Sequence, residues 1–211
     1  MSKPKIKIFQ YMHGDFDYFR WSGQINRRYC ERHGYEYVVR HDEPRTDRHI
    51  CWHKIPVAIT ELQDCDYLLC VDADAVFYSH ELTIENELLP KLHDKRILMP
   101  ADCGSESERW QPEYLCDAVM LMKNDARVRD MLTQWDHTTE IDEETRWVWP
   151  PTQLALRRHI LPKFKEEIQS VADYYGVHGR WGQFIRHFYL ASDESRTRAM
   201  KTIVERVAAG R

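Results

Sequence analysis

Residues 67–71, YLLCV, form a short apolar run that ends directly at two aspartates, Asp72 and Asp74, in the sequence DADA. A strand that is apolar at every position suits a sheet covered on both faces. Sheets of that kind occur in folds where helices alternate with strands. We therefore expect an α/β fold in which a mostly parallel central sheet is flanked by helices.

The rest of the chain alternates as this fold requires. Apolar runs predict further strands near residues 6–11, 35–39, 96–100 and 118–122. The spacing of apolar residues predicts helices near residues 18–33, 55–62 and 128–135, and a last one that begins at Ser192 or Asp193. Gly34 is expected to end the first helix. Residues 101–113 and the acidic segment 136–152, DHTTEIDEETRWVWPPT, are expected to be loops.

The two aspartates follow a buried strand, so they are expected at its carboxyl end, where sheets of this type bind ligands. In extended chain, residues two apart point the same way, so both carboxylates can face one ligand. Two carboxylates held close repel each other, and a divalent cation removes that cost. Oxygen ligands suit Mn²⁺ or Mg²⁺, whose coordination shell a diphosphate can complete. The alternative is that the aspartates serve only in a turn or as a helix cap.

Composition excludes several classes of protein. The 211 residues carry a formal net charge of −4, which gives no support for a nucleic-acid or anionic-membrane partner. No apolar run approaches the roughly 18 residues of a spanning helix, and the N-terminus lacks the apolar stretch of a signal peptide. The six cysteines form no CxxC pair and are expected to be reduced thiols in a cytoplasmic protein.

Four segments together resemble one family. Residues 49–77, HICWHKIPVAITELQDCDYLLCVDADAVF, resemble the W-x-K-[IL]-P…YDYxxWxDADAxF segment of GT-A glycosyltransferases in the α-galactosyltransferase and xyloglucan α-xylosyltransferase group. Residues 116–135, 150–160 and 182–188 are similar to later segments of that family, in the same order and at similar spacing. The chain has the size of the small soluble bacterial and algal-virus members.

The resemblance implies one GT-A (Rossmann-like) domain over residues 1–211, with a nucleotide-binding part at about 1–100 and an acceptor and sugar part at about 101–211. It also implies a hexosyltransferase that takes a hexose from a UDP-sugar of the glucose or galactose type and passes it to a glycan acceptor, with retention of configuration. The expected cofactor is Mn²⁺ or Mg²⁺.

The resemblance also assigns the metal ligands. Asp72 would contact the donor ribose or the metal shell, Asp74 would bind the metal directly, and His187 would be the third protein ligand. Judged from its neighbours alone, His187 would be an ordinary strand or surface residue.

Further site residues follow from the same segments. Asp117 stands where the family has an asparagine, and Gln153 matches the glutamine of its D-Q-x-A-L motif. Both are candidates for groups beneath the donor sugar, and Lys54, in WHKIP, would lie near the donor. The alternatives are a polar residue at a helix start for Gln153 and a surface lysine for Lys54.

The end of the first strand, at Gln10 and Tyr11, is the expected place for the nucleotide base. Tyr11 could stack on uracil, and backbone groups near Gln10 could pair with its edge. Trp147 and Trp149 are candidates for an acceptor wall, because aromatic faces suit sugar rings. The alternative is that these two tryptophans pack in the core.

One departure from the family concerns the diphosphate. The family often places a lysine five residues after the metal histidine, and here that position is Ser192. Arg196, Lys54 or a backbone amide would then have to hold the diphosphate.

Two other functions fit parts of the sequence. A metal phosphatase of the haloacid dehalogenase type opens with a strand and D-x-D-x-[TV], which residues 72–76 match, but no acidic pair such as GDxxxD follows residue 150. A non-catalytic relative that only binds a nucleotide sugar would fit the missing lysine.

Overall fold

The computed structural model describes residues 3–43, 45–101, 115–171, 182–189 and 191–209. In chain order its strands and helices are β1 (Ile6–Tyr11), α1 (Asp17–His33), β2 (Glu36–Arg40), α2 (Lys54–Glu61), β3 (Tyr67–Val71), β4 (Ala75–Phe77), α3 (Ile84–Glu87), β5 (Ile97–Pro100), β6 (Val119–Lys123), α4 (Ala126–Ile141), α5 (Glu143–Trp147), α6 (Pro151–Ala155), α7 (Leu161–Phe164), β7 (Ile168–Val171), β8 (Ile185–His187) and α8 (Asp193–Ala208).

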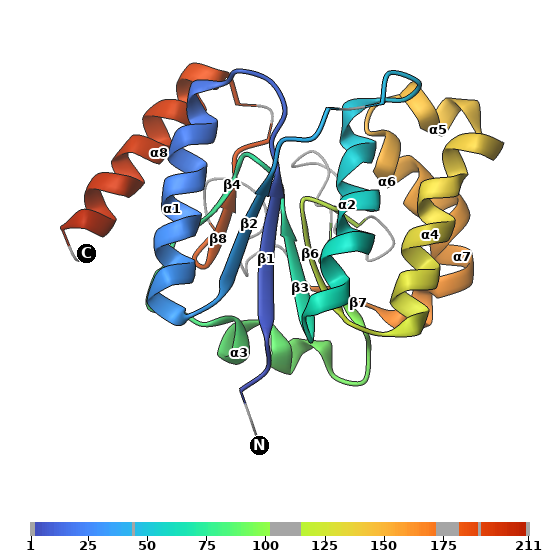
Figure 1. The fold of residues 1–211 in the computed structure, drawn as a ribbon, viewed down its shortest axis with the longest axis horizontal. Coiled ribbons are helices and arrows are strands. Elements are labelled where there is room, and N and C mark those ends of the chain that lie inside the picture. Colours follow the sequence, from blue (N-terminus) through green and yellow to red (C-terminus); the bar gives the residue numbers. More distant parts are fainter. Residues whose placement is uncertain (1–2, 44, 102–114, 172–181, 190, 210–211) are drawn as a thin grey trace.

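Six of these strands form one sheet in the order β2-β1-β3-β6-β5-β7. The pairs β1–β2, β1–β3 and β5–β7 are parallel, whereas β6 runs antiparallel to both of its neighbours. Helices α1 and α8 lie on one side of the sheet, and α2 and α4 lie on the other (Figure 1). The predicted α/β fold with a mostly parallel central sheet is confirmed.

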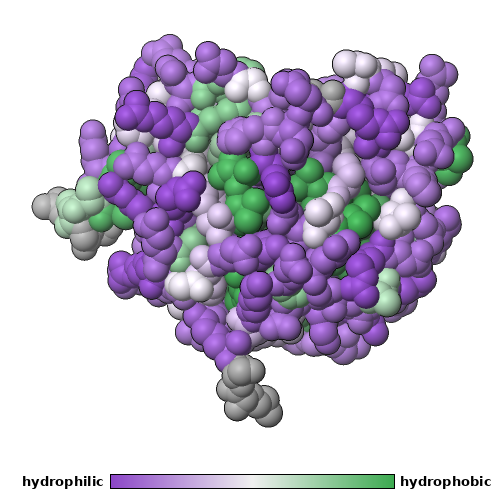
Figure 2. All heavy atoms as spheres, viewed as in Figure 1, coloured by the Kyte–Doolittle hydropathy of each residue, from purple (hydrophilic) through white to green (hydrophobic). Residues whose placement is uncertain are grey.

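The apolar strands are buried on both faces, as the YLLCV run predicted. In β3, Leu68 and Cys70 belong to the core beneath α2 and α4, and Leu69 and Val71 belong to the core on the opposite face. Strand β6 alternates in the same way. The face drawn in Figure 2 is mostly hydrophilic, and the largest hydrophobic areas on it lie near the middle of the view.

The helix ends follow the expected chemistry. Helix α1 ends at Gly34, whose φ of 72° is left-handed, and the N–H of Gly34 donates to the carbonyl of Cys30. Helix α8 begins after Ser192, whose hydroxyl accepts a hydrogen bond from the N–H of Ser195 at 3.3 Å.

The prediction that residues 136–152 form a loop was wrong. Helix α4 continues to Ile141, α5 begins at Glu143 after the single residue Asp142, and only residues 148–150 separate α5 from α6. The acidic composition concealed a helix start, because the Asp142 carboxylate accepts hydrogen bonds from the N–H groups of Glu144 and Thr145 and caps α5. Thr138 and Thr145 are buried on the inner side of this segment.

The other loop prediction, at residues 101–113, falls almost entirely outside the described residues. The five described cysteines are free thiols, and Cys103 also lies outside them. Within the described ranges, no helix combines the length and apolar character needed to cross a membrane.

Candidate active site

The DADA segment forms a tight turn between β3 and β4. The N–H of Asp72 donates to the carbonyl of Ala118 at 2.7 Å, and the N–H of Ala75 donates back to the carbonyl of Asp72 at 2.9 Å. We had expected extended chain to place both carboxylates on one side, and this expectation was wrong because residues 72–75 form a turn. A turn, and not an extended strand, places the two side chains.

Two buried amide side chains support this turn from below. The Gln10 amide group donates to the carbonyls of Asp72 at 2.8 Å and Ala75 at 3.2 Å. The Asn26 amide donates to the carbonyl of Ala75 at 3.0 Å and accepts from the N–H of Phe77 at 3.0 Å. The turn is thus fixed by β1 and α1 together.

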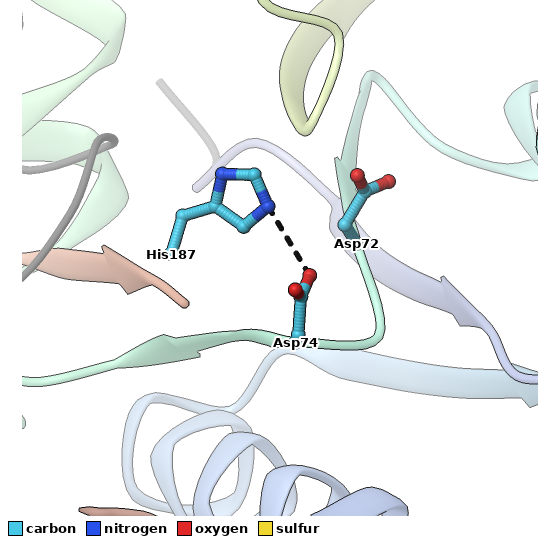
Figure 3. Close-up of side chains that lie close together, drawn as sticks. All are labelled: Asp72, Asp74 and His187. Carbon is cyan, nitrogen blue, oxygen red and sulfur yellow. Dashed lines mark ion pairs between the residues drawn. The ribbon is translucent and has the colours of Figure 1, made fainter. Parts of the chain in front are cut away.

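Strand β8 brings His187 to the same place from far along the chain. It pairs antiparallel with β4 so that His187 lies opposite Ala75, and the N–H of Phe188 donates to the carbonyl of Asp74 at 3.0 Å. The Nε2 atom of His187 lies 3.1 Å from Oδ1 of Asp74. The two side chains point toward each other, with Asp72 beside them across the turn (Figure 3).

One ligand atom each of Asp72, Asp74 and His187 lies within 4.8 Å of the others. Two carboxylate oxygens and an imidazole nitrogen form a donor set that suits Mn²⁺, and the carboxylates also suit Mg²⁺. Among the residues that the structure describes, this is the one group of three or more acidic, histidine or cysteine side chains spaced to hold a metal.

Lys54 is buried between two acids. Its Nζ lies 3.0 Å from Oδ1 of Asp72 and 3.1 Å from Oδ2 of Asp117, and it donates to the carbonyl of Asp117 at 2.9 Å. Only 7% of the residue is exposed, so the alternative of a surface lysine is wrong. Burial alone would lower the pKa of Lys54, but the charges of Asp117 and Asp72 outweigh burial and hold that pKa well above its usual value. Burial raises the pKa of Asp72, and the Lys54 ammonium acts against that rise.

Asp74 has two basic partners. Besides His187, Arg196 of α8 places Nη2 at 3.0 Å from Oδ2 of Asp74, and its Nε donates to the carbonyl of Phe188 at 3.1 Å. Burial would raise the pKa of Asp74, but the hydrogen bond and charge of His187, with the charge of Arg196, hold it below its usual value. Burial would lower the pKa of His187, and the hydrogen bond to Asp74 raises it instead.

Asp117 and Gln153 lie together on the other side of Lys54. Asp117 directly precedes Ala118 and β6 and is buried, while Gln153 projects from the first turn of α6. The Gln153 amide lies 3.4 Å from Oδ1 of Asp117 and donates toward it. Residues distant in sequence thus lie together here, while their roles stay predictions.

Two adjoining cavities open onto this cluster, and both are lined by Lys54, Asp72, Asp74, Arg196, Cys51 and Trp149. The one we call the inner cavity, of about 250 Å³, adds Asp117, Gln153, His187 and Tyr189. The one we call the aromatic cavity, of about 260 Å³, adds Tyr11, Phe16, Tyr18 and Phe19.

Of the two residues predicted to hold the nucleotide base, one lines a cavity and the other does not. Tyr11 lines the aromatic cavity, with its ring stacked on His53 at a centroid distance of 5.6 Å. The Gln10 side chain is fully buried beneath the turn and lines neither cavity. Sequence reasoning missed the other aromatic residues of this cavity, although the segment FDYF at residues 16–19, just after the first strand, was a signal.

The fold and the site together are those of a GT-A-like glycosyltransferase. The chain belongs to the galactosyl transferase GMA12/MNN10 family, whose model matches residues 10–117, just over half of the sequence. That match includes Lys54, Asp72, Asp74 and Asp117 and ends before Gln153 and His187.

Solved structures show the same fold. A glycosyltransferase involved in the glycosylation of the major capsid of PBCV-1 superposes with a TM-score of 0.74 at 14% identity, over 94% of this chain and 100% of that chain. The glycosyltransferase GlyE of Streptococcus pneumoniae TIGR4 gives 0.56 at 13% identity, over 99% of this chain, which spans 64% of GlyE. No curated protein matches the sequence significantly.

Proposed function

We propose that this protein transfers a hexose from a UDP-sugar of the glucose or galactose type to a glycan acceptor, in a reaction that depends on Mn²⁺ or Mg²⁺ and retains anomeric configuration. The observation that carries the proposal is the convergence of Asp72, Asp74 and His187 within 4.8 Å, at the junction of two cavities in a glycosyltransferase fold.

Asp72, Asp74 and His187 would hold the metal ion, and their mixture of oxygen and nitrogen donors fits it. When bound, the ion supplies Lewis-acid neutralisation of the leaving diphosphate. The His187–Asp74 hydrogen bond orients the imidazole before the ion binds.

Arg196 and Lys54 are the basic groups nearest the proposed diphosphate. Ser192, at the position of the family lysine, serves as the cap of α8, and Arg196 extends from the first turn of that helix to Asp74. A guanidinium can donate two parallel hydrogen bonds to phosphate oxygens. Arg196 therefore takes over the role of the absent lysine.

The two cavities suggest where the donor lies. The aromatic cavity offers Tyr11 and Tyr18 as faces for the nucleobase. The inner cavity offers Asp117 and Gln153, whose carboxylate and amide can hydrogen-bond sugar hydroxyls and hold the anomeric carbon in place.

This arrangement also supports two functional parts that follow each other along the chain. All described residues that line only the aromatic cavity precede residue 74, and all of those that line only the inner cavity follow residue 115. A nucleotide-binding part at about 1–100 and an acceptor and sugar part at about 101–211 remain our proposal for its organisation.

The decisive experiment measures thermal unfolding with UDP, GDP or CMP, each with Mn²⁺ or with excess chelator. We expect a large rise in melting temperature for UDP with Mn²⁺ only, because ligand binding to the native state stabilises it. Equally tight UDP binding in excess chelator would falsify the metal assignment.

Turnover separates the remaining alternatives. Release of UDP from UDP-glucose or UDP-galactose, with retained configuration in the product, supports the transferase. Cleavage of a generic phosphomonoester without UDP-sugar turnover would favour the phosphatase, which the family match does not support. UDP binding without any turnover would favour the non-catalytic relative.

A further inference from the structure

Exposed aromatic side chains gather at the rim of the active-site cavities. Six large hydrophobic residues of the described ranges are exposed: Phe16, Ile141, Trp147, Val148, Trp149 and Tyr189. Three of these, Phe16, Trp149 and Tyr189, line a cavity, and Trp149 lines both. Apolar surface left in water at the mouth of a pocket is a common mark of a binding site.

Trp149 is held in place without being buried. It lies in the short extended segment between α5 and α6, which is fixed by hydrogen bonds from the N–H of Val148 to Glu144 at 2.9 Å and from the N–H of Leu154 to Pro150 at 3.0 Å. The His49 ring lies 5.4 Å from the indole. Even so, 65% of Trp149 is exposed.

Tyr189 reaches the inner cavity from a different part of the chain. It follows β8, its ring centroid lies 5.5 Å from that of His187, and 43% of the residue is exposed. The inner cavity therefore has two aromatic side chains at its rim, from segments 40 residues apart (189 − 149), and the polar pair Asp117 and Gln153 in its lining.

We propose that Trp149 and Tyr189 form the acceptor platform of the enzyme, on which the terminal pyranose ring of a glycan packs with a hydroxyl directed into the inner cavity. The C–H-bearing face of a pyranose is apolar and matches an aromatic ring, while its hydroxyls suit neighbouring polar groups. This inference rests on the proposed function and names the acceptor class for the same site.

The exposure of Trp149 assigns it to the acceptor and not to the donor. The two basic groups proposed to meet the donor diphosphate, Lys54 and Arg196, are far less exposed than Trp149, and the nucleobase has its own aromatic walls. A donor seated there would leave the outer rim open. The second substrate would then enter across Trp149, which has the most exposed aromatic ring among the residues that the structure describes.

The test uses the whole protein and measures UDP release from its UDP-sugar donor with and without a panel of neutral glycans: methyl glucosides, methyl galactosides, lactose, maltose and cellobiose. We expect at least one of these pyranosides to accelerate UDP release by the unaltered protein. Trp149→Ala should raise the KM for that glycan about three- to tenfold, the value of one aromatic contact. Trp149→Phe should restore most of the loss.

Trp147→Ala is the matched control. Trp147 is the same residue type two positions away, and the sequence offered it too for the acceptor wall. In the structure it is 48% exposed and lines neither cavity, so its removal should leave the glycan KM unchanged. An equal loss in both alanine variants would overturn the platform.

Other outcomes separate this inference from the proposed function. Absence of both UDP binding and UDP release would contradict the proposed function itself. Normal donor reactions with no response to any pyranoside, or with a response that Trp149→Ala does not alter, would overturn only the platform. If Trp149→Ala weakened UDP binding as much as glycan use, Trp149 would belong to the donor site.

Discussion

Arg196 reaches Asp74 from the first turn of α8, and its charge is the strongest candidate to meet the donor diphosphate. Replacing it by glutamine keeps a polar side chain but removes the guanidinium. We expect Arg196→Gln to weaken UDP binding in the presence of Mn²⁺ about 10- to 100-fold, since a hydrogen bond to a charged group contributes about 1.5–3 kcal/mol. Isothermal titration with UDP measures this.

Arg198→Gln is the control for that variant, because Arg198 lies on the same helix, is exposed and pairs only with Glu194 among the described residues. Equal affinities in the two variants would show that Arg196 does not contact the diphosphate.

At the scale of single residues, the sequence predicted which residues would gather in the candidate site, and their roles stay predictions. The DxD pattern after an apolar strand located Asp72 and Asp74, and the family segments located His187, Asp117 and Gln153, which the structure brings together. The role of the Gln10 side chain was not predictable, because a glutamine at a strand end gives no sign that it is buried under a turn. Only the folded chain shows which carbonyls need its amide.

One asparagine side chain hydrogen-bonds α1 to β4. Asn26 bonds to both Ala75 and Phe77, so it ties the helix to the strand that follows the acidic turn. We expect Asn26→Leu to lower the free energy of unfolding by about 2–3 kcal/mol, because a buried N–H is left without a partner. Denaturant unfolding measures the change, with exposed Asn86→Ala as control.

The same substitution should also loosen the turn itself. We expect weaker Mn²⁺-dependent UDP binding in Asn26→Leu at temperatures where the variant is fully folded. Unchanged binding would mean that Gln10 alone holds the turn.

The end of α2 is joined to β1 and β2 through Glu61. Its carboxylate accepts from Lys7 at 3.1 Å and from Nε of Arg40 at 2.7 Å. Burial would raise the pKa of Glu61, but the hydrogen bonds from Arg40 and Lys7 outweigh burial and lower that pKa. A lowered pKa in the folded state means stability that is complete above the ordinary glutamate value and is lost as the pH falls through the folded value.

We therefore expect Glu61→Gln to lose about 3 kcal/mol of unfolding free energy at pH 7, because the buried Lys7 would lose its nearer carboxylate and keep only the more exposed Glu36, at 3.7 Å, as a charged partner. The gap between the two proteins should shrink as the pH falls below about 4.5. Denaturant unfolding at pH 7 and pH 4 measures it. A gap that stays constant across this range would contradict the assignment.

At the scale of elements, strands were predicted better than connections. A long apolar strand can be predicted from the pattern of its own residues. The two short strands β4 and β8 form only by pairing with each other, across more than 100 residues of sequence. The loop predicted at 136–152 failed for a related reason: its charges were taken as a sign of solvent, yet Asp142 caps a helix and the threonines face inward.

Across the whole molecule, the β4–β8 pair joins the two halves of the chain at the proposed metal site. Binding of Mn²⁺ and UDP should therefore slow hydrogen exchange in residues 185–188, whose amides include the Phe188 N–H bonded to Asp74. Helix α4, which contributes no site residue, should change little. Hydrogen-exchange mass spectrometry with and without both ligands measures this. Equal slowing in the two segments would show a global effect.

The sequence predicted the fold of the whole molecule because the alternation of helices and strands follows from the local spacing of apolar residues. It did not predict that β6 would run antiparallel inside the sheet, since strand direction depends on the path of the connecting chain and not on the residues of the strand. The family match stops at residue 117, so the later site residues rest on shorter motifs.

Cys51 lies in the wall shared by both cavities, yet burial raises the pKa of its thiol to about 12. Burial also raises the pKa of Cys65, to about 11, and those of Cys30 and Cys70. Thiolate, the reactive form, is scarce at neutral pH for all four. Alkylating reagents should therefore react slowly with these thiols in the native protein. The rate at which the thiols are labelled would then report how often the protein unfolds far enough to expose them.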